Sequence, residues 1–205
     1  MPHALVLQFP SPEALPSALL SRLPEPDYAD EKCMRFIVEE GFSLSEADAA
    51  LLSSRQIDHV VLPDMAFGEL GLIVSDMDST LITIECVDEI AAGVGLKDRV
   101  AEITERSMRG ELDFEQSLRS RVALLAGLDE RVLAEVYENV LRLSPGAEFL
   151  LDECKAHGVK FMLVSGGFTF FTERLQQRLG FEYQHANVLE IENGKLTGRL
   201  KGRII

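Results

Sequence analysis

The stretch Leu72-Ile73-Val74-Ser75-Asp76-Met77-Asp78-Ser79-Thr80 decides the fold that this sequence predicts. Its first four residues form a continuous apolar and β-branched run, which is typical of a strand buried on both faces of a parallel sheet. Polar residues follow at once. Because an open α/β domain binds its ligand at the carboxyl ends of its strands, we expect a functional site where this strand ends.

Asp76 and Asp78 are spaced so that both side chains point into one small volume if the segment is extended. Two carboxylates there repel each other unless a cation lies between them or one is protonated. Hard oxygen ligands on a loop favour Mg²⁺, and beside a metal one carboxylate can attack an electrophile while the other moves a proton. Ser79 and Thr80 add donors suited to a phosphate. The alternative, an acidic turn with aspartate as a helix cap, is disfavoured by the preceding apolar strand.

A second candidate segment is Ser165-Gly166-Gly167, which follows the apolar run of residues 159–164. Glycines let backbone N–H groups approach an anion closely, so this segment suits a phosphate. Alone it is weak evidence, because Ser-Gly-Gly is also a common turn. Two parallel neighbouring strands would bring both segments to the same edge of a sheet, and together they predict a phosphate site.

The order of elements predicts an α/β fold with a parallel sheet and an inserted helical cap. Residues 85–143 are helical in pattern and would form the cap. Residues 71–84 and 144–205 would form the core, ending in a hairpin turned at Asn193-Gly194.

Residues 1–70 read as a small N-terminal α/β extension. Apolar runs flanked by proline predict strands at residues 4–9 and 57–62. Helices are predicted at residues 13–23, 30–40 and 45–53.

Composition narrows the functional classes. The 205 residues include 34 acidic and 20 basic side chains, a net charge of −14, which argues against a nucleic-acid or anionic-membrane surface. Cys33, Cys86 and Cys154 lie far apart, which favours a reducing cytosol over a disulfide framework or a zinc site. We expect a cytoplasmic protein that acts on a small molecule, without nucleic-acid or membrane partners.

Four segments, taken together and in this order, resemble the phosphoserine phosphatases of the haloacid dehalogenase superfamily. The resemblance covers roughly residues 71–205. The segments are residues 76–80 with 85–90, residues 108–114, residues 117–122 and residues 165–171.

The resemblance implies Mg²⁺-dependent hydrolysis of O-phosphoserine to serine and phosphate, the last step of serine biosynthesis. Asp76 would be the nucleophile and would form an aspartyl-phosphate. Asp78 would protonate the departing serine oxygen and then activate water. Mg²⁺ would bind a carboxylate oxygen of Asp76 and the backbone carbonyl of Asp78.

The resemblance also assigns six residues to substrate binding. They are Glu85 for the ammonium group, Arg121 for the carboxylate, Ser165 and the N–H of Gly166 for the phosphoryl oxygens, and Met108 and Phe114 for the apolar wall of the cap. Without the resemblance, Glu85 and Arg121 read as surface residues, and Met108 and Phe114 read as ordinary core.

The family continues beyond the point equivalent to Ile205, with a lysine that steadies the aspartyl-phosphate and a Gly-Asp-Gly-x-Asn-Asp segment that completes the metal site. Lys195 and Lys201 lie too early to replace that lysine. We therefore expect a C-terminally truncated chain that is inactive alone and self-associates, through an open strand edge or by a swapped contact, with a homodimer as one outcome. Two alternatives stay open: a related phosphatase or phosphotransferase with another small substrate, and a non-catalytic fragment that only binds ligand.

Overall fold

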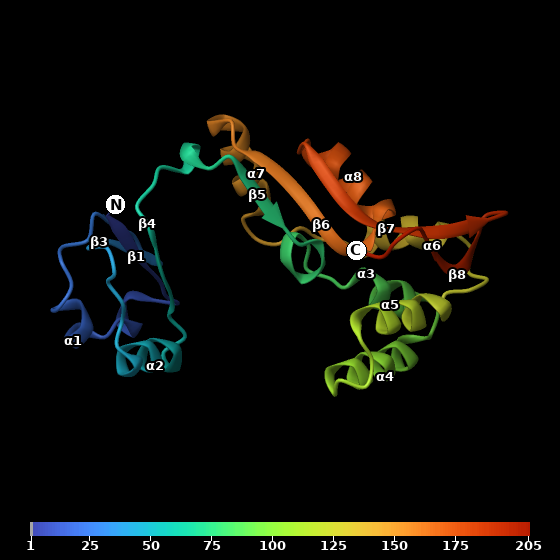
Figure 1. The fold of residues 1–205 in the computed structure, drawn as a ribbon, viewed down its shortest axis with the longest axis horizontal. Coiled ribbons are helices and arrows are strands. Elements are labelled where there is room, and N and C mark those ends of the chain that lie inside the picture. Colours follow the sequence, from blue (N-terminus) through green and yellow to red (C-terminus); the bar gives the residue numbers. More distant parts are fainter. Residues whose placement is uncertain (1) are drawn as a thin grey trace. The chain divides into compact units, whose positions relative to one another are not determined.

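The computed structural model describes residues 2–205 and divides the chain into two compact units, Met1–Ala66 and Phe67–Ile205 (Figure 1). The division lies four residues before the boundary expected between residues 70 and 71. Each unit has an apolar core of its own. No helix among the described residues is long and apolar enough to cross a membrane.

The first unit is a four-stranded antiparallel sheet in the order β2-β3-β1-β4, with its helices packed on one face. Its core includes Leu5, Leu7, Phe36 and Leu52, all 2% exposed or less. The elements are β1 (His3–Gln8), η1 (Pro12–Ala14), α1 (Ser17–Leu20), β2 (Tyr28–Ala29), β3 (Cys33–Val38), α2 (Glu46–Ser54) and β4 (Asp58–Pro63).

Two sequence predictions for this unit need correction. The helix predicted at residues 30–40 is wrong, because that segment contains β3, which pairs with both β1 and β2. The helix predicted at residues 13–23 is two short turns, η1 and α1, separated at Pro16, which caps the second. The predicted strands and the helix α2, capped by Ser45, are confirmed.

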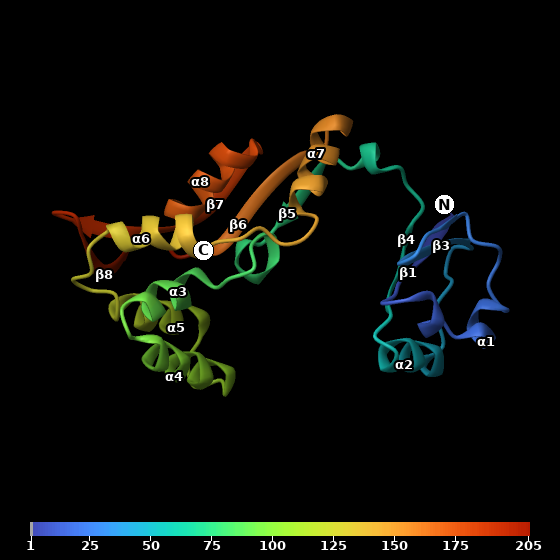
Figure 2. The same cartoon turned by 180° about the vertical axis from the view of Figure 1, so that it is seen from behind.

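The core of the second unit is a four-stranded sheet in the order β5-β6-β7-β8 (Figure 2). The first three strands are parallel, and β8 returns antiparallel to β7. Asn193 and Gly194 both have positive φ, 51° and 75°, as the tight turn of this hairpin requires. The elements are η2 (Phe67–Glu69), β5 (Leu72–Ser75), α7 (Ala147–His157), β6 (Lys160–Phe168), α8 (Thr169–Leu179), β7 (Tyr183–Glu192) and β8 (Lys195–Lys201).

Strand β5 differs from the expectation in one respect. Within the described residues it pairs only with β6, which leaves the open strand edge that we expected, but its two faces are not both buried. Leu72 is 45% exposed and Val74 is 59% exposed, whereas Ile73 packs against the core. The composition of the run predicted the strand correctly but overstated its burial.

The helical insertion predicted for residues 85–143 is present, and the turn η3 leads into it. Backbone hydrogen bonds tie its far end to the hairpin: Gly127 N–H donates to the Leu196 carbonyl (2.8 Å), and Leu196 N–H donates to the Leu128 carbonyl (2.9 Å). The elements are η3 (Met77–Leu81), α3 (Cys86–Gly93), α4 (Lys97–Met108), α5 (Phe114–Ala123), α6 (Arg131–Glu135) and η4 (Val136–Val140).

Candidate active site

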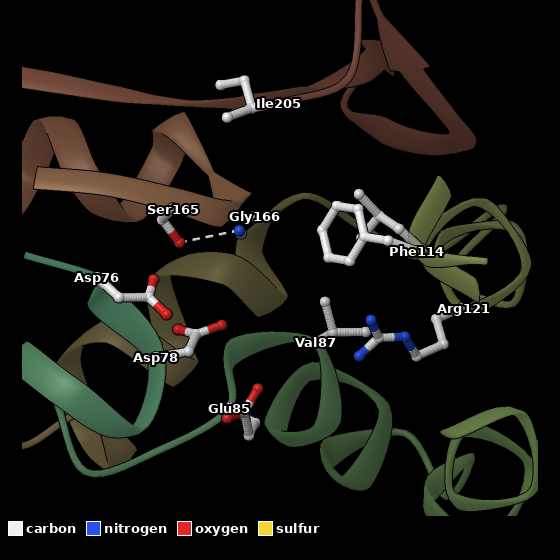
Figure 3. A pocket seen from close by; sticks show the side chains of 11 residues that line it. Asp76, Asp78, Glu85, Val87, Phe114, Arg121, Ser165, Gly166 and Ile205 are labelled. Atoms are coloured by element: carbon white, nitrogen blue, oxygen red, sulfur yellow. Dashed lines mark hydrogen bonds between the residues drawn. The ribbon is translucent and has the colours of Figure 1, made fainter. Parts of the chain in front are cut away.

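A cavity of about 210 Å³ lies where β5, β6 and the helical insertion meet (Figure 3). Seven of the eight site residues expected from the sequence line it, and only Met108 does not. The lining residues are Asp76, Asp78, Glu85, Val87, Phe114, Leu118, Arg121, Ser165, Gly166, Gly167 and Ile205.

The parallel pairing of β5 and β6 brings the two candidate loops together. Ser75 stands opposite Leu163, so Asp76 and Ser165 follow at the same edge of the sheet. This is the juxtaposition that the two strand-end motifs predicted.

The turn after β5 directs its carboxylates through local hydrogen bonds. Met77 N–H donates to Asp76 Oδ1 (2.6 Å), which fixes that carboxylate, and the Met77 side chain is fully buried. Ser79 has φ 52°, a left-handed conformation uncommon for serine, and its hydroxyl donates to Glu85 Oε1 (2.8 Å). The Ser79 hydroxyl of this turn therefore also orients Glu85.

The pKa of Asp78 is raised to about 6, chiefly by burial and also by the nearby charges of Glu85 and Asp76, while hydrogen bonds from Cys86 act in the opposite direction. Asp78 Oδ1 is buried and has no hydrogen-bond partner in the described part of the chain. A carboxyl group with this pKa can both donate and accept a proton near neutral pH.

The segment Ser165-Gly166-Gly167 forms a bulge inside β6 and is not a loop after it. Gly167 N–H donates to Ser165 Oγ (2.9 Å), which leaves the Ser165 hydroxyl proton available to a ligand. A Cβ atom on Gly167 would lie 2.9 Å from Met77 Cε and 3.1 Å from Ser165 Oγ, so a larger residue here would make the Met77 side chain and the Ser165 hydroxyl shift.

The helical insertion supplies the opposite wall. The Phe114 ring lies against Gly166, where an added Cβ atom would come within 2.7 Å of Phe114 Cζ. Arg121 reaches the cavity from α5, and its Nε is buried without a hydrogen-bond partner among the described residues. Such a group is available to bind an anionic ligand.

Met108 needs correction as a wall residue, because it is the last residue of α4 and is 85% exposed. Val87 and Leu118, which sequence reasoning missed, supply buried apolar wall instead. Leu118 could have been found, since Phe114, Leu118 and Arg121 follow the i, i+4, i+7 spacing of one helix face.

The donor set fits Mg²⁺ in part. Among residues 2–205, no group of three or more His, Cys, Asp or Glu side chains is placed to hold a metal ion. Asp76 and Asp78 offer hard carboxylate oxygens, one of them an orphaned buried atom, and protein Mg²⁺ sites often use only one or two carboxylates with water and phosphate oxygens.

Comparison with known proteins gives the class. Residues 73–204 match the model of the haloacid dehalogenase-like hydrolases, and the chain belongs to that family. In the solved structures, a family hydrolase from Salmonella enterica serovar Typhi superposes with a TM-score of 0.84 at 29% identity, covering 100% of this chain and 74% of that one. The predicted α/β fold class is thereby confirmed.

Within the family, the similarity is to phosphoserine phosphatases. The chain is 55% identical over 139 residues to that of Albidiferax ferrireducens, a match covering 67% of this chain and 59% of the relative. It is 49% identical over 150 residues to the phosphoserine phosphatase of Archaeoglobus fulgidus, a match that covers 73% of this chain and 43% of the relative. The unliganded probable phosphoserine phosphatase of Vibrio cholerae superposes with a TM-score of 0.75 at 35% identity, covering 99% of this chain and 64% of that one. The chain spans less than two thirds of these three proteins.

Proposed function

We propose that this chain carries the nucleophile, the proton carrier and the substrate-binding residues of a Mg²⁺-dependent phosphoserine phosphatase. The observation that carries the proposal is the cavity itself. It gathers two carboxylates from the end of β5, the Ser165–Gly166 cradle from β6, and one acid and one arginine from the helical insertion.

In the first step, an Asp76 oxygen attacks phosphorus and the bond between phosphorus and the serine oxygen breaks. Asp78, whose pKa is raised to about 6, gives its proton to the departing oxygen. Ser165 Oγ–H and the N–H of Gly166 donate to the phosphoryl oxygens as their charge changes.

In the second step, Asp78 takes a proton from water while the water oxygen attacks the aspartyl-phosphate. Phosphate leaves, and both carboxylates return to their starting states. Mg²⁺, bound by Asp76 and the backbone carbonyl of Asp78, would neutralise negative charge on the phosphoryl group.

Substrate choice would rest on the charges that face each other across the cavity. Glu85 would bind an ammonium group and Arg121 a carboxylate, and Phe114, Val87 and Leu118 would supply apolar wall of the same cavity. O-Phosphoserine carries both groups as well as the phosphate.

The test is phosphate release from O-phosphoserine and from phosphate esters lacking its ammonium or carboxylate group, with Mg²⁺. It uses the 205-residue chain and, beside it, the longest polypeptide that its gene encodes. In the active protein, Asp76→Asn should abolish hydrolysis with an unchanged circular dichroism spectrum, because an amide cannot form the acyl-phosphate. Appreciable activity in Asp76→Asn, after deamidation is excluded by mass spectrometry, would contradict the proposal.

A further inference from the structure

Asn187 is a buried polar residue beside the cradle that the sequence motifs do not include. Its side chain is 3% exposed, and it stands on β7 opposite Phe168 of β6. It is not among the residues that line the cavity. Because buried amides are almost always hydrogen-bonded, the partners of Asn187 indicate its role.

The bulge in β6 removes backbone groups from the β6–β7 ladder. Between two consecutive pairings β7 advances by one residue, from Ala186 to Asn187, while β6 advances by three, from Ser165 to Phe168. A buried carbonyl left without a partner is strongly unfavourable. Asn187 Nδ2 donates to the Gly166 carbonyl (2.8 Å) and so replaces a ladder hydrogen bond.

The Gly166 carbonyl and the Gly167 N–H belong to one planar peptide group. Asn187 holds the carbonyl end of this group, and Ser165 Oγ accepts from the N–H end at 2.9 Å. The plane is thus fixed at both ends, and with it the position of the Ser165 hydroxyl. Since Ser165 accepts from Gly167, its own proton is directed elsewhere.

The two partners of Asn187 also determine which way its amide faces. Ile205 N–H donates to Oδ1 (3.0 Å), while Nδ2 donates to the Gly166 carbonyl. One partner is a donor and the other an acceptor. Asparagine satisfies both, whereas an aspartate would place a carboxylate oxygen against the Gly166 carbonyl.

We propose that Asn187 is a positioning residue of this site: its amide holds the Gly166–Gly167 peptide so that the Ser165 hydroxyl and the Gly166 N–H are presented to a phosphate group. The inference rests on the proposed function, because it assigns a support to the cradle used there. Asn187 acts through this peptide and does not touch the anion.

The test is the affinity of the longest polypeptide that the gene encodes for inorganic phosphate, with Mg²⁺ present, measured by calorimetry on the unaltered protein and on Asn187→Asp. At about pH 8, we expect phosphate binding to be weaker by roughly 10-fold or more, since an ionised carboxyl repels the Gly166 carbonyl. At about pH 5, the ratio of the two dissociation constants should shrink, because burial raises the pKa of the introduced carboxyl and its protonated form can donate to that carbonyl.

Other groups that titrate are common to both proteins and cancel in this ratio. Asp76, Asp78, Glu85 and Arg121 line the cavity, and His185 precedes Asn187 on β7. A role confined to general stability would give a ratio that does not change with pH.

Asn187→Ser keeps the test decisive if Asn187→Asp does not fold, and Thr172→Val is the control for a general loss of stability. Asn187→Ser is uncharged and too short to reach Gly166, so phosphate binding should weaken about 3- to 10-fold, equally at both pH values. Thr172→Val removes another hydrogen bond of this unit, which the buried Thr172 donates from Oγ1 to Gln184 Oε1 (2.7 Å), and should lower the melting temperature without changing phosphate affinity.

Unchanged phosphate affinity in the folded Asn187 variants would overturn the inference, as would a loss matched by Thr172→Val. In either case phosphate binding and phosphoserine hydrolysis by the unaltered protein would stand. Absence of both in the unaltered protein would instead overturn the proposed function, and the inference with it.

Discussion

At the scale of single residues, the buried carboxyl of Asp78 links stability to pH. Its pKa is raised from 3.8 to about 6, chiefly by burial, so the folded chain binds this proton more tightly than the unfolded chain does. Below about pH 4 the carboxyl is protonated in both the folded and the unfolded chain, and it does not lower the free energy of unfolding. As the pH rises through about 6, the folded state must hold a buried charge, and stability is lost.

We therefore predict that Asp78→Asn stabilises the metal-free chain above about pH 6 and not below about pH 4. The gain in the free energy of unfolding should be about 1–3 kcal/mol, because a shift of one pKa unit corresponds to about 1.4 kcal/mol and this site is not completely buried. Urea unfolding with a chelator present, across this pH range, measures it. Asp152→Asn, at an exposed position of α7, is the matched control and should stay within about 0.5 kcal/mol. A constant difference across the range would contradict the assigned cause.

Arg121 provides a prediction about selectivity. If its guanidinium binds the substrate carboxylate, Arg121→Lys should lower activity on phosphoserine although the positive charge is kept, because a point ammonium cannot reproduce the planar fork of the guanidinium. In the active protein, kcat/KM for phosphoserine should fall by roughly 100-fold, as expected when a charge-assisted pair of up to about 3 kcal/mol is lost.

The control for Arg121→Lys is a second substrate. For a phosphate ester without a carboxylate, kcat/KM should change little in Arg121→Lys, since Arg121 has no carboxylate to bind in that substrate. Equal losses on both substrates would show that Arg121 supports the fold of α5 and does not select the substrate.

At the scale of elements, the cradle depends on close contact between β6 and α5. Gly166→Ala would place a methyl group 2.7 Å from Phe114 Cζ, so the ring or the bulge must move. We predict that phosphate affinity falls about 10-fold or more, in keeping with the 1–3 kcal/mol that overpacking costs. Calorimetry with inorganic phosphate and Mg²⁺ measures the effect.

Two variants show whether the Phe114 contact is the cause. Gly93→Ala adds a methyl group where nothing lies within 4 Å and should leave phosphate affinity unchanged. Adding Phe114→Leu to Gly166→Ala should recover part of the loss, because the smaller side chain makes room. No recovery would mean that the bulge, and not the ring, is disturbed.

The elements also show which parts of the fold local sequence can predict. Strands β5 and β6 were predictable because apolar runs lead directly into polar strand-end motifs, and the hairpin because Asn-Gly suits its turn. The segment around β3 was not. Its start, Asp30-Glu31-Lys32, has the charges of a helix N-terminus, yet Asp30 Oδ1 accepts from the N–H groups of Lys32 and Cys33 (both 2.7 Å) and forms a turn. Pairing with distant strands then decides the conformation.

The same distinction applies to the candidate site. The carboxylates and the Ser-Gly-Gly segment could be found because their chemistry follows from residue type and spacing. Val87 and Asn187 could not, because a buried valine and a buried asparagine carry no local signal, and their roles arise only from where α3 and β7 place them.

At the scale of the whole chain, the sheet of the second unit has an open edge at the four-residue strand β5. Within the described residues β5 pairs on one side only, and Leu72 and Val74 are 45% and 59% exposed. An apolar edge strand without charge or proline is prone to pair with another chain. The first unit also ends in an edge strand, β4, but that strand carries Asp58 and ends at Pro63.

We predict that the 205-residue chain self-associates through β5, and that Val74→Lys shifts it toward monomer because a charge on the edge opposes pairing. Sedimentation velocity over a range of concentrations measures the distribution. Val60→Lys is the matched control: Val60 is an equally branched residue, 43% exposed on the edge strand β4, and its replacement should leave the association unchanged. A monomeric unaltered chain at every concentration would contradict the prediction. So would dispersal by Val60→Lys and not by Val74→Lys, because association would then depend on the first unit and the open β5 edge would play no part in it.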